Sequence, residues 1–513
     1  MDISKSVNSS SEKNDIINIS IILTIALAIG IYLIATTVLI AKDGVSYIEW
    51  AQKFSTDPVY VIKGDTCGYP FLIFLSHKFA TYKIVTLFSN NTSVYTWIYS
   101  AQCITLLCKL LALIPLYFIC KGFVGRKLSF WAILILVLLP YPARFGSDAL
   151  RDWPYILFLA TGFLFLLRAA RQDTWWMFGI AGLATGLGHL IRPECAQLVI
   201  YGVLWLFTGL LLPKRNMSRP KLICALLILL IGFAIPAVPY MKARGKILPK
   251  KLKALISSCC RLEQDEIQEP NSDNCNQAYT IMSLLPNIAK AIGRLIERIS
   301  ENLMYFFVPA LLLGIYSRLG RKSVGMEIES FFISVFIGFN VIMMVLLHYT
   351  YGYISRRHCL PLVVFTVFYV PIGLQISADW LRKKSYKSPL ENNKNPQLWF
   401  FILLAVGAVI CLSKLMTTMR AEKQGYIGAS KWLKENTTKE DVVAVPDKRI
   451  SFYAEREGIV YKGGNIPPTV VYVVKIMKDA DKELNLCENA REVHSLWLDK
   501  RKKGEKLVIY KLM

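Results

Sequence analysis

The chain has 513 residues, of which 54% are hydrophobic and only 19% are charged. Soluble domains carry about 25% charged residues, so this composition excludes an ordinary soluble enzyme. The net charge of +24 would suit a nucleic-acid partner. The basic residues, however, gather in short clusters between apolar runs, which is typical of membrane topology and argues against nucleic acid.

The first apolar run covers residues 16–41 and follows a polar segment, residues 1–15. This run is too long for the hydrophobic part of a cleaved signal peptide, and no small-residue cleavage site follows it. We therefore predict a retained anchor with its N-terminus in the cytoplasm. Apolar runs of about 20 residues predict membrane spans, and ten further spans are expected at residues 95–119, 128–141, 153–168, 175–191, 194–212, 221–241, 302–317, 329–348, 356–379 and 397–413.

The predicted fold is a mainly α, polytopic membrane protein of about eleven transmembrane helices. Most Lys and Arg residues of the short connections lie on the side of the N-terminus, which the positive-inside rule assigns to the cytoplasm. This orientation places three longer segments, residues 42–94, 242–301 and 414–513, on the outer face. A transporter usually has two related halves and short loops, and the sequence shows no convincing repeat.

Two of the outer segments contain predicted interfacial helices. Residues 43–54 have an apolar and a polar face, and the break at residues 68–70 precedes an apolar piece, residues 71–75, too short to span. We expect that piece to be re-entrant or to lie in the interface. Residues 285–299 repeat apolar side chains at helical spacing, which predicts an amphipathic helix at the membrane surface.

The third outer segment, residues 414–513, predicts a small α/β domain beyond a membrane domain of residues 16–413. It contains no phosphate-binding loop and no nucleophile elbow, so we expect it to cover the site or to bind an acceptor. The expected elements are a helix at residues 426–436 and strands at 441–445, 469–477 and 507–513.

The twelve cysteines have no paired CxxC spacing, so no zinc site is expected and no metal ligand is assigned. A requirement for a divalent metal or another cofactor stays open. Cys259, Cys260 and Cys275 share a polar outer loop, where a disulfide is one alternative.

Three aspartates are candidate catalytic residues because carboxylates at a membrane interface are costly. Asp43 follows the first span directly, although it would also suit the start of the next helix. Asp148 and Asp152 stand four residues apart before the fourth span, a spacing that places both on one face of a helix. Arg151 lies close enough to pair with one of them, and capping plus an ion pair is the structural alternative.

Cationic residues at the same face are candidates for binding an anion. Arg192 could hold a phosphate through two hydrogen bonds, or could pair locally with Glu194. Arg356 and Arg357 open the tenth span, where they would either contact an anion or anchor the helix at the interface. Further cations lie in the outer segment 242–301, with Lys250 and Lys251 among them.

Four short stretches resemble motifs of the membrane-embedded GT-C glycosyltransferases, which include aminoarabinose transferases, rhizobial lipopolysaccharide sugar transferases and protein O-mannosyltransferases. Asp43-Gly44-Val45-Ser46-Tyr47 resembles the acidic motif of the first outer loop, with Gly44 where a second acid is often found. Residues 147–154 resemble the motif at the fourth span. Residues 182–194 resemble a Gly-rich span ending in Arg-Pro-Glu, and residues 356–361 resemble the Arg-Tyr-x-x-Pro signature with His358 in the Tyr place.

The resemblance implies a hexosyl or pentosyl transferase of the bacterial inner membrane that takes its sugar from a polyprenyl-phosphate donor. Such a donor must be met at the bilayer, because each buried CH₂ of its tail contributes about 0.8 kcal/mol. Asp43 would deprotonate the hydroxyl of a lipid, glycan or protein acceptor, with inversion at the sugar carbon. The implied site comprises the catalytic acids Asp43, Asp152 and Asp148, the donor-phosphate ligands Arg192, Arg356, Arg357, Lys250 and Lys251, and the acceptor-side or supporting residues Tyr47, Glu194 and His189.

Three alternatives remain on the sequence. A polysaccharide polymerase or ligase would share the outer segments and differ mainly in its donor. A transporter or flippase would move a substrate without making a bond. A non-catalytic relative stays open because Gly44 replaces an acid of the motif.

Overall fold

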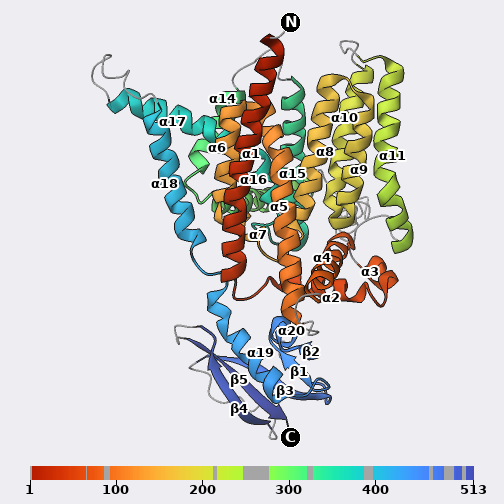
Figure 1. Cartoon of the computed structure of the whole chain (residues 1–513), viewed down its shortest axis with the longest axis vertical. Helices are drawn as coiled ribbons and strands as arrows, with labels where there is room; N and C mark the ends of the chain where they lie inside the picture. The colour runs from red at the N-terminus through yellow and green to blue at the C-terminus, as the bar shows by residue number, and fades with distance from the viewer. Residues whose placement is uncertain are drawn as a thin grey trace.

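The computed structural model describes residues 3–64, 66–85, 93–211, 217–245, 276–319, 327–385, 397–461, 466–478, 490–499 and 504–512. A helical bundle makes up most of the molecule, and a small sheet lies beyond one end of it (Figure 1). The helices α2, α3 and α4 lie between the bundle and the sheet, and the two termini lie at opposite ends of the molecule (Figure 1). Cys259, Cys260 and Cys275 lie outside the described residues.

Each expected span falls on a described helix, and the tenth is formed by two helices, α16 and α17, that meet at a bend of 55°. The helices of the bundle are α1 (Ile3–Thr36), α5 (Val94–Val124), α6 (Arg126–Leu138), α8 (Asp152–Gln172), α9 (Trp175–Ile191), α10 (Gln197–Leu211), α11 (Arg219–Arg244), α14 (Val308–Leu319), α15 (Glu327–Tyr351), α16 (Leu360–Thr366), α17 (Tyr369–Ser385) and α18 (Leu398–Leu415).

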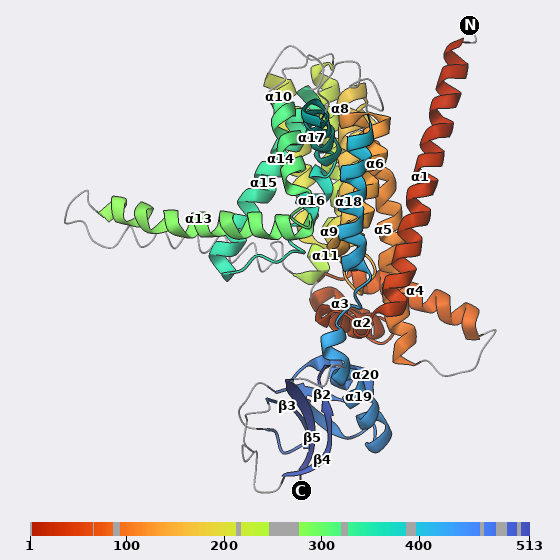
Figure 2. The ribbon, with the colours of Figure 1, turned by 90° about the vertical axis from the view of Figure 1, so that its left-hand side faces the viewer.

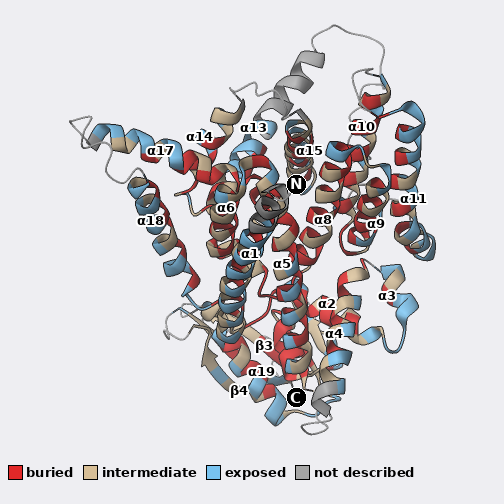
Figure 3. Ribbon diagram, turned by 45° about the horizontal axis from the view of Figure 1, so that its top comes forward, coloured by how far each residue is buried: buried red, intermediate tan, exposed pale blue. Residues whose placement is uncertain are grey.

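The expected spans are a mixture of long and short helices. Among the described residues, 7 helices are long and apolar enough to cross a bilayer, and the bent α16–α17 pair makes an eighth if it counts as one span. The other expected spans, at α6, α9 and α14, are shorter. Buried residues line the sides of the helices that face one another, while exposed residues cover much of α1, α11 and α18 (Figure 3). The chain is a multi-pass membrane protein.

Close packing of α9 on α11 depends on glycines. A Cβ at Gly182 would collide with the backbone of α11 at Leu229, and a Cβ at Gly232 would collide with the backbone of α9 at Gly179. Small residues allow such close approach of helix backbones, which favours association where lipid replaces water. The Gly-rich stretch that was singled out in the sequence therefore has a packing role at this helix pair.

The end of the bundle that faces the C-terminal sheet contains helices that do not run along the bundle (Figure 1). These are α2 (Lys42–Lys53), α3 (Pro58–Gly64) and α4 (Gly68–Val85), with α7 (Pro140–Phe145) and the 3-10 turn η1 (Pro193–Ala196) in the connections. The predicted helix at residues 43–54 is confirmed as α2, and the apolar piece after residue 70 belongs to a helix that begins at Gly68. The amphipathic helix is α13 (Asn276–Asn302), which extends sideways from the bundle (Figure 2).

The C-terminal part is an α/β unit, as predicted. Its sheet has the strand order β2-β1-β3-β5-β4, with β1 parallel to both β2 and β3, and β5 antiparallel to β3 and β4. β2 and β4 had no counterpart in the sequence prediction. The elements are η3 (Ala421–Lys423), α19 (Gln424–Asn436), β1 (Val442–Val445), α20 (Lys448–Ala454), β2 (Gly458–Val460), β3 (Val470–Lys478), β4 (Ala490–Trp497) and β5 (Glu505–Leu512).

We expect Gly182→Val to lower the stability of the protein in detergent by about 1–3 kcal/mol, because the larger side chain forces α9 away from α11. The thermal midpoint of the purified variant measures this effect. Gly338→Val on α15 is the matched control, since a Cβ at Gly338 meets no atom within 4 Å. Equal midpoints for the two variants would contradict the packing role of Gly182.

Candidate active site

Asp43 lies in the first turn of α2, where the chain has just left α1. The N-cap residue Ala41 accepts a hydrogen bond from the Gly44 amide through its carbonyl at 3.0 Å. An acidic side chain in the first turn is favoured by the helix dipole. The Asp43 side chain remains 54% exposed, so its carboxylate is accessible from outside the protein.

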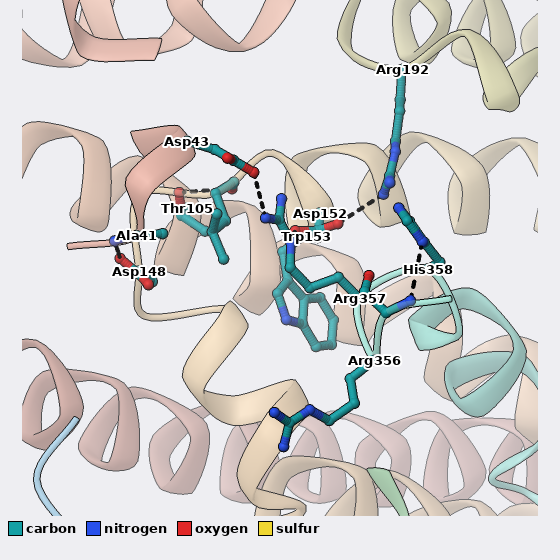
Figure 4. A network of polar contacts seen from close by, with 12 residues as sticks. Ala41, Asp43, Thr105, Asp148, Asp152, Trp153, Arg192, Arg356, Arg357 and His358 are labelled. Atoms are coloured by element: carbon teal, nitrogen blue, oxygen red, sulfur yellow. Dashed lines mark hydrogen bonds and ion pairs between the residues drawn. The ribbon is translucent and has the colours of Figure 1, made fainter. Parts of the chain in front are cut away.

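Arg357 joins Asp43 to a second, buried carboxylate. It lies in the connection between α15 and α16, 314 residues away from Asp43 in sequence. Its Nη1 donates to Asp43 Oδ2 at 2.7 Å and its Nε donates to Asp152 Oδ2 at 2.8 Å. Figure 4 shows the guanidinium between the two carboxylates. The exposed acid is therefore held by a cation that is itself anchored in the protein interior.

Asp152 begins α8 and is almost completely excluded from solvent, with a side-chain exposure of 1%. Its other oxygen, Oδ1, accepts a hydrogen bond from Arg192 Nη1 at 2.7 Å. Arg192 lies between α9 and η1, 8% exposed, with its guanidinium 5.4 Å from the centre of the Tyr155 ring. Removing one charge from a buried ion pair leaves its partners without a counter-charge. Asp152, Arg192 and Arg357 therefore act as one unit.

The carboxylates hold both arginines firmly in the charged state. Burial lowers the pKa of Arg357, but the charges of Asp152 and Asp43 raise it above its ordinary value. For Arg192 burial likewise lowers the pKa, and Glu194 and Asp152 raise it beyond that loss. One of these permanent cations, Arg357, stands beside the exposed carboxylate of Asp43, and the other, Arg192, holds the opposite oxygen of Asp152. A charged arginine at the exposed acid is suited to an anionic ligand.

Asp148 and Asp152 do not share a helix face, contrary to the sequence prediction. Residues 146–151 form a turn and α8 begins only at Asp152. Proline is tolerated in the first turn of a helix but not further inside, so Pro154 favours this late start. Arg151 donates a hydrogen bond to the Thr66 hydroxyl at 2.5 Å.

Asp148 faces the chain that precedes Asp43. It is 1% exposed, and its Oδ1 accepts hydrogen bonds from the amides of Ala41 at 3.0 Å and Ala149 at 2.8 Å. Its Oδ2 accepts one from Arg420 Nη2 at 2.5 Å. These contacts favour a positioning role for Asp148 over direct chemistry. Arg420, 272 residues away in sequence, was not found by the sequence analysis, because no local pattern marks it.

Gly44 is in tight contact with the turn before α8. A Cβ at this position would lie 2.8 Å from both the Cβ and the carbonyl oxygen of Ala149. A second acid therefore does not fit at residue 44 without moving this turn. The glycine in the acidic motif has a packing reason here, and it allows α2 to approach the segment that contains Asp148.

The remaining predicted residues lie around the cluster that Asp43, Asp152, Arg192 and Arg357 form. Tyr47 is buried with its ring 5.5 Å from the Arg151 guanidinium, and burial raises the pKa of its hydroxyl. Glu194 is half-exposed and lies 3.7 Å from Arg192 Nε, so the local pair considered from sequence is present. His189 is buried with its ring against Phe233 and Tyr240 of α11.

Arg356 points away from the cluster (Figure 4). Its guanidinium lies 4.3 Å from the centre of the Tyr141 ring, and its Nε is 3.6 Å from Glu301. Lys250 and Lys251 lie outside the described residues. In the part of the chain that the structure describes, there is no group of three His, Cys, Asp or Glu side chains placed to hold a metal ion.

Comparisons with known proteins match this architecture. The family model of the dolichyl-phosphate-mannose-protein mannosyltransferases matches residues 80–238. The archaeal oligosaccharyltransferase AglB from Archaeoglobus fulgidus, solved with an inhibitory peptide and a dolichol-phosphate, aligns with 90% of this chain and 69% of its own, at 12% identity and a TM-score of 0.55. ArnT from Cupriavidus metallidurans, solved with undecaprenyl phosphate, aligns over 95% of this chain and 97% of its own, at 11% identity and a TM-score of 0.53.

The chain has the fold of the GT-C glycosyltransferases. The resemblance stated from the sequence motifs is thereby confirmed at the level of fold. No curated protein sequence matches the chain. Each of the four motif stretches contributes one residue to the cluster of Asp43, Asp152, Arg192 and Arg357, a convergence that fold similarity alone does not require.

Asp152→Asn and Asp43→Asn should differ in their effect on stability. Losing the buried charge of Asp152 leaves two arginines without their common partner and should cost about 3–5 kcal/mol. Losing the half-exposed charge of Asp43 should cost about 0–1 kcal/mol. Thermal midpoints of the purified variants in detergent measure both, and a larger loss for Asp43→Asn would contradict the described roles.

Proposed function

We propose that the protein is a glycosyltransferase that moves a sugar from a polyprenyl-phosphate donor to an acceptor hydroxyl on the outer face of a bacterial inner membrane. The observation that carries the proposal is the exposed Asp43 carboxylate held beside Arg357, within a GT-C fold. Two structures of that fold contain dolichol-phosphate and undecaprenyl phosphate, which supports a lipid-linked phosphate donor for this chain.

Asp43 is proposed as the general base. An acceptor hydroxyl attacks the anomeric carbon of the donor sugar while the bond from that carbon to the phosphate oxygen breaks. The hydroxyl proton goes to Asp43, and the electron pair of the broken bond leaves with the polyprenyl phosphate. Direct displacement inverts the sugar carbon. The donor already carries a good leaving group, so the positioned carboxylate supplies what the reaction lacks.

Arg357 is proposed to contact the departing phosphate. Its guanidinium has five N–H groups, and its hydrogen bonds to side chains of the described residues are those to Asp43 and Asp152. The bond from Nε to buried Asp152 keeps the side chain in place while the outer edge accepts an anion. When phosphate competes for Nη1, the Asp43 carboxylate is released from Arg357 and can turn toward the acceptor hydroxyl.

The other cations have lesser parts in this proposal. Arg192 orients Asp152 from inside, and Arg356 lies against Tyr141 on the far side of the connection. Tyr47, Glu194 and His189 are proposed to support the residues of the site instead of reacting. The proposal leaves the sugar, hexose or pentose, and the acceptor, lipid, glycan or protein, to experiment.

An oligosaccharide-transferring polymerase or ligase is the second candidate, favoured by the structural similarity to an oligosaccharyltransferase. It uses the same carboxylate on a larger lipid-linked donor. The donor that the purified protein accepts distinguishes the two functions. A polyprenyl-phosphate monosaccharide is expected for the sugar transferase, and a lipid-linked oligosaccharide for the polymerase or ligase.

The test is transfer of label from a panel of radiolabelled lipid-linked donors to a membrane extract by the reconstituted protein. We expect the wild type to transfer one donor and Asp43→Asn to lose about 10²–10⁴-fold of that rate, the usual contribution of a general base. Asp57→Asn in the exposed connection after α2 is the control for a carboxylate lost elsewhere, and should retain transfer.

Two results would contradict the proposal. Full activity of Asp43→Asn would remove the base assignment. Absence of transfer from every donor by a folded wild-type protein would favour a transporter or a non-catalytic relative.

A further inference from the structure

The irregular segment 38–41 connects α1 to α2 and sets the place where Asp43 begins its helix. Leu39, Ile40 and Ala41 are buried. Buried backbone N–H and C=O groups have to be paired, and a segment outside regular structure cannot pair them with itself. The partners of Val38, Leu39 and Ile40 come from residues beyond position 416, whereas Ala41 is bonded to Asp148 and to the Gly44 amide.

Two contacts come from the linker that follows α18. The amide of Val38 donates to the carbonyl of Met419 at 3.3 Å, and Arg420 Nη1 donates to the carbonyl of Leu39 at 2.6 Å. Arg420 also bonds Asp148 through Nη2, and Asp148 in turn accepts from the Ala41 amide. One guanidinium thus ties the connection to the turn before α8.

Two further contacts come from α20 of the C-terminal unit. The Ile40 amide donates to the Tyr453 hydroxyl at 3.1 Å, and Arg449 Nη1 donates to the Ile40 carbonyl at 3.2 Å. Tyr453 and Arg449 are themselves buried. Arg449 is oriented by Asp447, which accepts from its Nε at 2.9 Å and its Nη2 at 2.7 Å. Asp447 therefore fixes the orientation of the Arg449 side chain that contacts the Ile40 carbonyl.

The C-terminal unit also contacts two helices next to this segment, α2 and α5. Lys448 Nζ contacts Glu49 of α2 at 2.5 Å, and the Glu455 carboxylate accepts from the Val94 amide at the start of α5 at 3.3 Å. The unit therefore meets α2, α5 and the connection before α2 at once. A cover that only bound an acceptor would not need to hold the backbone of residues 38–41.

We propose that the C-terminal unit is a positioning element of the active site, in which Tyr453, Arg449 and Arg420 hold residues 39–41 and so set the position of Asp43 relative to Arg357. This inference rests on the proposed function. Misplacement of a catalytic group by about 1 Å costs roughly 10²-fold in rate. The positioning residues touch no substrate; they act through the backbone that leads to the carboxylate.

The test uses the full-length protein with Tyr453→Phe, which deletes one hydroxyl and keeps the ring. Hydrogen exchange of the peptide that contains Ile40 and Ala41 should become several-fold faster, because the Ile40 amide loses its acceptor. The kcat should fall roughly tenfold or more while the KM for the donor stays unchanged. Tyr95→Phe is the matched control, since its ring packs against Tyr453 at 5.9 Å between centroids on an exposed side chain.

Arg420 supplies a second, independent variant. Arg420→Gln should lower kcat in the same way, and Arg420→Lys should restore part of it because a cation can still reach Leu39 O or Asp148. A purely structural role would lower the thermal midpoint of each variant, and it would not lower kcat selectively while the KM stays unchanged.

The outcomes separate this inference from the proposed function. Unchanged exchange at residue 40 in Tyr453→Phe overturns the contact, and faster exchange with an unchanged kcat overturns its role in positioning. A wild-type protein that transfers no sugar overturns the proposed function and the positioning role together, while the exchange result still reports on the contact itself.

Discussion

A carboxylate removed from water has to be paired, and the site is arranged around the buried carboxylate of Asp152. Both oxygens of Asp152 are occupied, one by Arg192 and the other by Arg357. Because the two arginines come from connections 165 residues apart in sequence, three helical segments must converge at the start of α8. Arg357 has a second partner, the exposed Asp43. The position of the outer carboxylate is thus a consequence of the buried ion pair.

The other side of Asp43 is constrained by packing and by the backbone. Gly44 lies against Ala149, and Asp148 holds the amide of Ala41. These contacts join α2 to the turn before α8, so the two acidic motifs of the sequence form one unit with different tasks. Asp43 stays exposed, Asp152 anchors a cation, and Asp148 holds the backbone. The C-terminal part of the chain completes the arrangement, because its side chains pair the backbone amide and carbonyl groups of Leu39 and Ile40 that Asp148 does not reach.

Local patterns in the sequence predicted most of the fold. Apolar runs placed the spans, and the break at residue 68 marked the beginning of α4. The site was predicted in part, because Asp43, Asp152, Arg192 and Arg357 all stand beside helix ends. Two kinds of information were missing. Whether Asp148 and Asp152 share a helix face depends on where α8 begins, and the spacing of the two residues does not give that position. Arg420, Arg449 and Tyr453 lie more than 250 residues from their partners, and only the folded chain brings them together.

The most direct test of this account is a structure of the protein in lipid nanodiscs with a polyprenyl phosphate bound, determined by electron cryomicroscopy. The account predicts that the phosphate contacts the Arg357 guanidinium, that Asp152 keeps its bonds to both arginines, and that Asp43 is released toward the space where the sugar would lie. A phosphate bound away from Arg357, with the Asp43–Arg357 pair intact, would contradict it.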